Sequence, residues 1–305
     1  MRSQVKHSSI AIATVAVIAT MWGTSPVIGQ SASGYKAPRT ADGHPDLNGI
    51  WQALNTAYWN IEAHGAEIAP HYQLVGTYLA QPPGLSVVEG GTIPYKPEAL
   101  AKRKQHLENR LKPDVNLVLD NSIGADMADP EAKCFQGGVP RVNYMPYPFQ
   151  VIQSKDAVVM AYQYGSSTRM IYLDRDFKDL FEILSWMGQS VGRWDGDSLV
   201  VTTKWFDGTS LPAIWLDRAG NYYSEKAVVT ERYTRASPDH LTYEATIDDS
   251  SVFTRPWTIR MPLYRRVEPD MELLEFQCIP FAEEFMYGQL IKQHNVSGLQ
   301  KGRPR

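Results

Sequence analysis

Residues 190–205 read SVGRWDGDSLVVTTKW, and this stretch indicates the fold class more directly than any other. Two runs rich in Val, Thr and Trp flank the segment Asp195-Gly196-Asp197. An Asp-Gly centre between two β-rich runs is the strongest short-range signal for a β-hairpin. The stretch therefore predicts two antiparallel strands joined by a tight turn.

Similar runs, separated by short polar turns, continue on both sides of this hairpin. They predict further strands at Phe149–Gln153, Ala157–Tyr164, Arg169–Leu173, Lys226–Arg235, Leu241–Asp248, Phe253–Arg265 and Met271–Cys278. About eight or nine strands of this kind predict a mainly β fold. We expect an antiparallel up-and-down (lipocalin-like) barrel or a strongly curved sheet.

The segment before these strands has a different texture, rich in proline and irregular in pattern. One helix is predicted near 97–110, because Pro97 suits the first helical position and Glu98 lies in the first turn. His106 is expected on the solvated, charged face of that helix. We expect residues 30–145, with one or two helices, to wrap a barrel formed by 146–290, and residues 291–305 to form a flexible tail.

The first residues are typical of a secretory signal peptide, about 1–29. Arg2 and Lys6 form a positive start, Ile10–Met21 an apolar run, and Gly29 a small-residue exit. The apolar run is shorter than the roughly 20 residues that a membrane-spanning helix needs. A periplasmic or secreted protein without a membrane span in the mature chain is therefore expected.

Charge excludes one class of partner. The full chain has 30 Lys+Arg and 33 Asp+Glu, and without Arg2 and Lys6 the balance is 28 against 33, a net charge of −5. Nucleic-acid binding needs clustered positive charge to neutralise phosphates, and the sequence has no basic run. Hydrophobic residues make up 43% of the chain, which indicates a folded protein rather than a disordered one.

The chain contains two cysteines, Cys134 and Cys278. In an oxidising compartment an even pair predicts one disulfide. Two buried free thiols are the alternative, because the sequence does not supply the required Cα separation. The sequence gives no indication of the oligomeric state.

Common catalytic and cofactor motifs are absent from the sequence, so no cofactor and no metal are expected. The chain lacks the nucleophile elbow, the dinucleotide-binding and phosphate-binding glycine motifs, His-Glu-x-x-His and Cys-x-x-Cys. The segment Asp42–Gly49 lacks the register of a calcium loop and has Ala53 where a bidentate Glu is needed. It predicts an Asx-type turn leading into a strand.

Several segments resemble a family of secreted bacterial β-rich proteins. They read DGHPDLNGIW (42–51), DPEAKC (129–134), YMPYPFQ (144–150), GRWDGDSLVV (192–201) and FTRPW (253–257). The resemblance spans nearly all of the mature chain. It implies export and a β-rich fold, and it assigns no catalytic residues. Gly49-x-Trp51 also resembles the lipocalin-type barrels.

Two prolines stiffen the segment 141–148 and favour extended neighbours. Arg141, Tyr144 and Tyr147 would then project from a rigid rim, where Tyr hydroxyls donate directional hydrogen bonds and Arg binds an oxyanion. A packed proline–aromatic corner is the alternative.

Other candidates come from single side chains. His64, with Glu62 on the same side of an extended segment, is a candidate base or a surface histidine. Tyr162 and Tyr164 share one strand face, and if that face is inward it meets Arg169.

Three further positions are weighed against ordinary structural roles. Asp217 is either a carboxylate at the barrel mouth or part of a salt-bridged turn. Glu283, near Tyr287 on a short closing helix, is either a desolvated acid or solvated. Trp186 and Trp215 lie outside ideal strand interiors and suit an aromatic-lined ligand cavity.

These features favour an exported, cofactor-independent enzyme of lyase, isomerase or hydratase type that acts on a small hydrophobic or aromatic molecule. In this hypothesis His64 or Glu283 is the base, Tyr144 or Tyr164 the acid, and Arg141 or Arg169 the anion anchor. The substrate-binding residues would also include Tyr147, Trp186, Trp215, Asp217 and Tyr287. The alternative is a non-catalytic, lipocalin-like carrier of a hydrophobic ligand.

Overall fold

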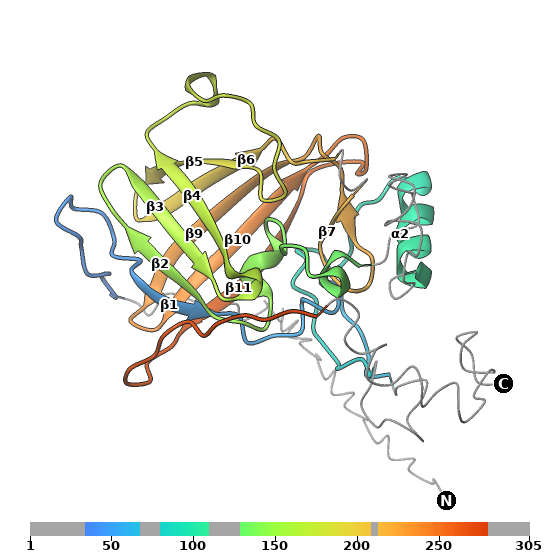
Figure 1. The fold of residues 1–305 in the computed structure, drawn as a ribbon, viewed down its shortest axis with the longest axis horizontal. Helices are drawn as coiled ribbons and strands as arrows, with labels where there is room; N and C mark the ends of the chain where they lie inside the picture. The colour runs from blue at the N-terminus through green and yellow to red at the C-terminus, as the bar shows by residue number, and fades with distance from the viewer. Residues whose placement is uncertain (1–33, 68–79, 110–128, 209–212, 280–305) are drawn as a thin grey trace, which may run out of the picture.

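The computed structural model describes residues 34–67, 80–109, 129–208 and 213–279. Nine strands form one closed barrel (Figure 1). Around the barrel they follow the order β1-β11-β10-β9-β6-β5-β4-β3-β2. Their bounds are β1 Gly49–Gln52, β2 Phe149–Gln153, β3 Ala157–Tyr162, β4 Ser167–Leu173, β5 Gln189–Asp195, β6 Ser198–Lys204, β9 Val228–Ser237, β10 His240–Asp248 and β11 Trp257–Arg265. The expected β-rich barrel is therefore confirmed.

The hairpin expected at 190–205 is present as β5 and β6. Asp195 pairs with Ser198 across the turn, and Gly196 has a φ of 59°. A residue that carries a side chain rarely adopts this left-handed backbone conformation, which explains why glycine lies at the centre of the turn. Strand ladders then continue through the longest pair, β9 and β10, to β11.

Two features depart from a simple up-and-down meander. Strands β4 and β5 run parallel, with Ile171 opposite Ser190, because the segment 174–188 crosses back along the barrel before β5 begins. That segment contains the short 3₁₀ helix η5 (Phe177–Asp179). A two-stranded hairpin, β7 (Ile214–Trp215) and β8 (Tyr222–Tyr223), is inserted between β6 and β9.

The N-terminal segment contributes to the barrel as well as covering it. Strand β1 closes the barrel between β2 and β11, with Trp51 opposite both Phe149 and Arg265. The amide of Asn48 donates to the carboxylate of Asp46 just before β1, which is the expected Asx turn. The expected strand at Met271–Cys278 is not formed, because these residues join no ladder.

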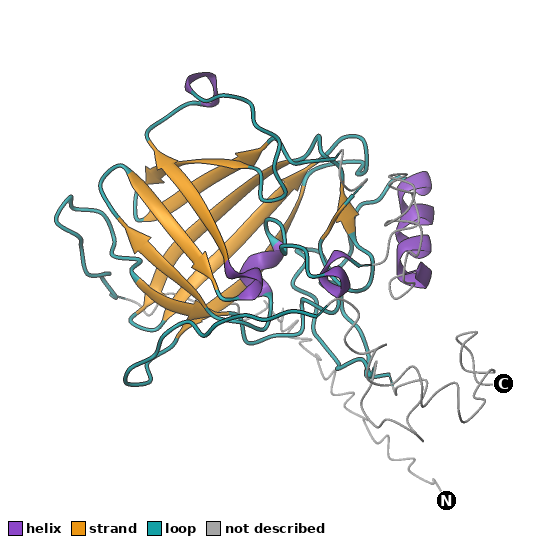
Figure 2. Ribbon diagram, in the orientation of Figure 1, coloured by secondary structure: helices purple, strands orange, loops and turns teal. Residues whose placement is uncertain are grey.

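One α-helix lies within the described residues: α2 (Pro97–Asn109). It packs on the β7–β8 hairpin at one end of the barrel (Figure 2). The 3₁₀ helices η2 (Pro130–Lys133), η3 (Arg141–Tyr144) and η4 (Tyr164–Ser166) lie near the same end. No helix among the described residues is long and apolar enough to cross a membrane.

Candidate functional site

Strand alternation sends one residue in two into the barrel, and several of these inward residues are polar. Along β9 the alternating buried positions are Val229, Glu231, Tyr233 and Arg235, and Ala236 is buried beside them. On the other strands, and on η3, buried polar groups meet Glu231 in one hydrogen-bonded group. We call it the interior cluster: Asn143, Tyr162, Arg169, Ser190, Thr203, Glu231, Tyr233 and Tyr243.

Glu231 is the centre of the interior cluster and is fully buried. Its Oε1 accepts hydrogen bonds from Asn143 Nδ2 at 2.9 Å and from the hydroxyls of Tyr233 and Tyr243, both at 2.8 Å. Its Oε2 accepts from Nη2 of Arg169. A buried carboxylate is tolerated only with such compensation, so these four donors are what allow a charged group inside the barrel.

Arg169 supplies the matching positive charge from β4. Its Nε donates to Ser190 Oγ at 2.9 Å, and its Nη2 also donates to Thr203 Oγ1 at 2.7 Å. Burial acts to lower the pKa of Arg169, but the Glu231 carboxylate outweighs burial and holds that pKa well above its usual value. Its Nη1 is buried and has no hydrogen-bond partner among the described residues.

The three tyrosines of the interior cluster are neutral hydrogen-bond donors. Burial, and next the negative charge of Glu231, raise the pKa of Tyr233 and of Tyr243 well above the usual value. Burial also raises the pKa of Tyr162, whose hydroxyl donates to Asn143 Oδ1 at 3.0 Å. The cluster therefore combines a carboxylate, a guanidinium and three phenols around one point, a set able to move protons and stabilise an oxyanion.

The helix η3 connects this interior to a second charged group at the barrel end. All four of its residues are buried. Asn143 reaches the interior cluster, whereas Arg141 joins a second group that we call the rim cluster: Asp129, Glu131, Arg141 and Arg218.

The rim cluster is two carboxylates interleaved with two guanidinium groups. Arg141 binds Asp129 through two hydrogen bonds of 2.7 and 2.9 Å and binds Glu131 at 2.7 Å. Arg218 donates to both oxygens of Glu131 and lies over the rings of Tyr58 and Trp59. Burial acts to raise the pKa of Glu131, but Arg218 and Arg141 outweigh it and hold that pKa below its usual value.

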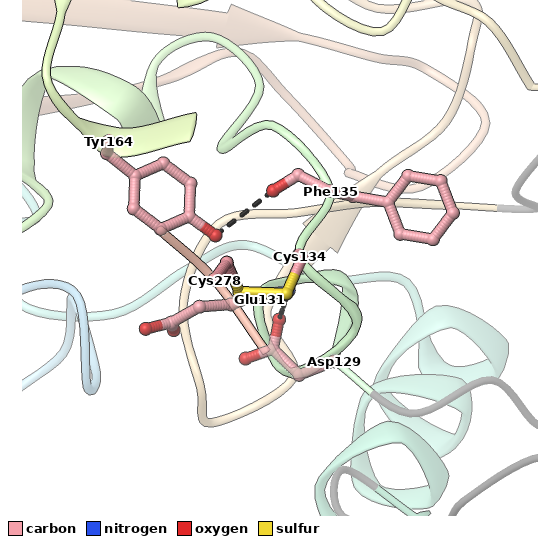
Figure 3. The surroundings of a disulfide bond; sticks show 6 residues. All are labelled: Asp129, Glu131, Cys134, Phe135, Tyr164 and Cys278. Atoms are coloured by element: carbon pink, nitrogen blue, oxygen red, sulfur yellow. Dashed lines mark hydrogen bonds between the residues drawn. A yellow bond between two sulfur atoms is a disulfide. The ribbon is translucent and has the colours of Figure 1, made fainter. Parts of the chain in front are cut away.

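A disulfide between Cys134 and Cys278 lies beside the two carboxylates of the rim cluster, Asp129 and Glu131 (Figure 3). The two Cα atoms are 5.7 Å apart and 144 residues apart in sequence. Cys134 directly follows η2, which contains Glu131 and has Asp129 as its N-cap residue, and Cys278 lies on the segment after β11. The pairing is thus confirmed, and a disulfide fits a protein outside the cytoplasm.

Asp217 forms no ion pair with the described residues, and the expected salt-bridged turn is not found among them. The residue is fully buried, and its partners among the described residues are the amides of Ile61 and Asn221 and the Asn221 side chain. Burial raises the pKa of Asp217 to about 6, although those hydrogen bonds oppose the shift. Its neighbour Tyr144 donates to the Leu216 carbonyl at 2.8 Å.

His106 is also placed differently from the expectation of a solvated helix face. It is 3% exposed, stacks on Trp215 with ring centroids 4.8 Å apart, and meets the edge of Tyr222. Its Nδ1 lies 3.3 Å from the Gly220 carbonyl. Burial lowers the pKa of His106 to about 4, so the ring is neutral in the folded protein at neutral pH.

The structure separates the sequence-predicted residues into several places. Arg169 is in the interior cluster and Arg141 in the rim cluster. Tyr147 and Tyr164 lie beside the rim cluster, with their ring centroids 5.7 Å apart and Phe276 against both.

The remaining predicted residues lie elsewhere. Trp186 stacks on Phe135, and Trp215 is covered by α2. His64 is half-buried and pairs with Gly84 in an isolated antiparallel bridge, with its Nδ1 2.8 Å from the Glu62 carbonyl. It has no hydrogen bond to either cluster within the described part of the chain. Glu283 and Tyr287 lie outside the described residues.

Sequence reasoning missed the two residues that connect the site, Glu231 and Asn143. The signal for Glu231 was present: it falls on the same strand face as Val229 and Tyr233, and a carboxylate on an apolar face needs a partner inside. Asn143 had no such signal, because a short 3₁₀ helix has no alternation to show which side chain faces the core.

No family model matches this chain, and neither does any curated protein. The fold and site define the class directly: a closed β-barrel with a hydrogen-bonded ion pair in its interior, covered at one end by η3 and the β7–β8 hairpin.

Proposed function

We propose that this protein is an exported, cofactor-independent enzyme that acts by acid–base chemistry on a small hydrophobic or aromatic molecule inside the barrel. The observation that carries the proposal is the convergence of Glu231, Arg169 and three neutral phenols on one point. Perturbed ionisable groups gathered in a shielded interior are typical of catalytic sites. The leader-like sequence at 1–29 and the disulfide support export.

Each group has a chemical role in this proposal. Glu231 accepts a proton from the substrate, and Arg169, which stays charged, stabilises the oxyanion that forms. Tyr162, Tyr233 or Tyr243 donates or returns a proton, since all three are neutral in the folded protein. These roles suffice for isomerisation, elimination or hydration.

In this proposal the substrate enters at η3. The helix lies outside the barrel ladder, and its side chain Asn143 contacts Glu231 directly. The rim cluster and the disulfide hold η3 and η2 in position. Outward movement of η3 would uncover Glu231 without breaking a strand pair.

Incubation with a metabolite mixture tests the proposal. The purified protein would be added in D₂O buffer to an organic extract of the producing organism's medium, and the compounds followed by mass spectrometry. The wild type is expected to convert a compound or to introduce deuterium into it. Glu231→Gln is expected to bind that compound without converting it.

Glu244→Gln is the matched control, because Glu244 makes the same kind of pair with Arg260 on the outer face of the barrel. This variant should behave as the wild type does. Binding without conversion by the wild type would instead identify a carrier of lipocalin type, and the absence of any bound compound would reject both functions.

A further inference from the structure

A groove of about 700 Å³ lies on the outer wall of the barrel. It is lined by the end of β9, the start of β10, the second half of β11 and the segments 54–56 and 83–87. No member of the interior cluster or of the rim cluster is among its lining residues. A pocket of this volume is in the range that holds a small molecule.

The groove lies at a gap in the barrel wall, along the edge of β11 that faces away from β10. On this side the Arg260 amide donates to the Val87 carbonyl at 2.8 Å. Further along, the Arg266 amide donates to the Ile50 carbonyl at 2.8 Å. Backbone groups of alternate residues face the same side of a strand, so Pro262 faces this side too. Between the two contacts no described segment pairs with Pro262 there.

Proline at this position excludes one kind of occupant. A peptide that added a strand to β11 would need a backbone donor at residue 262, and Pro262 has none. The Pro262 carbonyl, in contrast, remains an acceptor that faces the groove. A small molecule that brings its own donor therefore suits the gap better than a peptide strand does.

Two leucines make the sides of the groove apolar. Leu54 is 63% exposed and Leu85 is 90% exposed, and each comes from a different one of the two lining segments. Full burial of a leucine side chain is favourable by about 1.5–3 kcal/mol. An occupant with an apolar body would gain part of this free energy by covering both side chains.

Asn55 places a donor close to the Pro262 carbonyl. Its Nδ2 lies 3.3 Å from Sδ of Met261, the residue before Pro262, and a thioether is a weak acceptor. A hydroxyl group both accepts and donates hydrogen bonds. It therefore matches the Asn55 amide and the Pro262 carbonyl together.

The charges beside the groove restrict the occupant further. Arg260 lines the groove, and its guanidinium pairs with Glu244 and, at 3.2 Å, with Glu89. One positive charge already paired with two carboxylates leaves no excess positive charge to attract an anion. An uncharged molecule is favoured over a carboxylate.

We propose that this groove binds an uncharged alcohol or phenol with an apolar body. The hydroxyl group accepts from the Asn55 amide and donates to the Pro262 carbonyl, and the body lies between Leu54 and Leu85. This site is outside the barrel, so it is separate from the interior site of the proposed function.

Three probes that share one ring system test the site. 2-Naphthol has the hydroxyl group, 2-methoxynaphthalene lacks the donor, and 2-naphthoate carries a negative charge. NMR of the full chain with labelled Leu and Val methyl groups, at pH 7.5, gives the dissociation constant of each probe and the methyl groups that it affects. 2-Naphthol is expected to shift Leu54, Leu85 and Val87 and to leave the interior residue Val229 unchanged. It should bind at least about fivefold more tightly than 2-methoxynaphthalene and about tenfold more tightly than 2-naphthoate.

Variants at exposed leucines locate the apolar body. Leu54→Ser and Leu85→Ser should each weaken the binding of 2-naphthol by at least about fivefold. Leu274→Ser is the matched control, because Leu274 is 64% exposed, close to the value for Leu54, and does not line the groove. It should leave the binding unchanged. An unchanged Val229 methyl signal in each variant reports an intact barrel.

Four results would overturn the inference. They are no binding of 2-naphthol, equal or tighter binding of either other probe, shifts at Val229 in place of Leu54 and Leu85, and equal affinity in all three leucine variants. Methyl shifts that depend on protein concentration without any probe would instead identify a second copy as the occupant. The extract experiment with Glu231→Gln concerns the interior site alone, so the two proposals fail separately.

Discussion

At the scale of single residues, burial has changed the chemistry of several side chains that the sequence shows only as letters. His106 and Asp217 both lie near the β7–β8 hairpin, and burial moves their pKa values in opposite directions, lowering that of His106 to about 4 and raising that of Asp217 to about 6. The folded protein therefore holds a neutral His106 across the range in which a free histidine titrates.

His106 should make the stability of the protein depend on pH. Its pKa is 6.5 when unfolded and about 4 when folded, so above pH 6.5 both states are neutral and the residue has no effect. As pH falls from 6.5 to about 4, only the unfolded state gains a proton, and the free energy of unfolding falls by about 3 kcal/mol.

Urea denaturation at pH 7 and at pH 4 measures this effect. His106→Gln, which keeps a donor for the Gly220 carbonyl, should lose about 3 kcal/mol less than the wild type between the two values. Parallel losses in the two proteins would show that His106 titrates normally in the fold.

Gly220 illustrates a backbone requirement at the same place. Its φ is 83°, and an added Cβ would lie 2.8 Å from both His106 Cβ and Leu107 N. Gly220→Ala should therefore displace α2 and cost several kcal/mol, about 1–3 from the left-handed backbone alone. Amide exchange in α2 and urea denaturation would show it.

Gly196→Ala is the control for Gly220→Ala. Its φ of 59° carries the same backbone cost, but nothing lies within 4 Å of the added Cβ. If the two variants lose the same stability and α2 exchanges equally in both, close packing at Gly220 contributes nothing.

At the scale of elements, the local signals were reliable. The Asp-Gly turn produced β5 and β6, Pro97 begins α2, and alternation placed β9 and β10 within two residues of their observed bounds. Such signals depend on neighbours along the chain, which is why they can be read from it. The position of β1 and the parallel pairing of β4 with β5 depend on distant segments and were not predicted.

The disulfide is expected to act on the elements at the barrel end. It closes a loop of 144 residues, for which the chain-entropy model gives about 5 kcal/mol. Cys134→Ser/Cys278→Ser should lose stability of that order. In addition to this global loss, amide exchange should become faster in the segment 271–279, in η2 and in η3. Apart from the disulfide, the segment 271–279 is held by a few contacts, such as those of the Phe276 ring and of the Leu274 amide.

Hydrogen exchange under native conditions separates the local effect from the global one. Amides of β9 and β10 report global unfolding in both proteins. If the exchange rates of the η3 amides change only as much as those of the β9 and β10 amides, the disulfide stabilises the whole chain and does not specifically hold η3.

At the scale of the whole molecule, the ion pair Arg169–Glu231 joins β4 to β9 across the barrel. Removing one buried partner leaves the other charge uncompensated, so Arg169→Met should cost about 3–5 kcal/mol. Arg169→Met/Glu231→Gln should cost less than the sum of the single variants, because no charge remains.

Arg260→Met is the matched control, since Arg260 pairs with Glu244 on the outer wall where water screens the charges. We expect about 0–1 kcal/mol there. Chemical denaturation of the wild type, Arg169→Met, Glu231→Gln, the double variant and Arg260→Met measures the coupling. An Arg169→Met cost no larger than that of Arg260→Met would mean that the interior pair is already hydrated.

The candidate site could be predicted only in part, because its side chains come from segments far apart in the chain. Arg169 was predicted as a binding residue because it follows an inward tyrosine face, and it does lie in the interior. From the sequence, His64 or Glu283 was predicted as the base, and Glu231, the carboxylate that pairs with Arg169, was not singled out. A side chain's partner 62 residues away leaves no trace in local alternation.

The sequence by itself determined the β-rich class, the tight turns, the helix α2 and which strand faces turn inward, because each follows from the period and chemistry of adjacent residues. Only the tertiary structure decided that β1 closes the barrel, that Cys134 joins Cys278, and that η3 carries Asn143 to Glu231. These are contacts between segments far apart in the chain. They are selected by the shape and charge of the folded barrel, which exist only once all nine strands are in register.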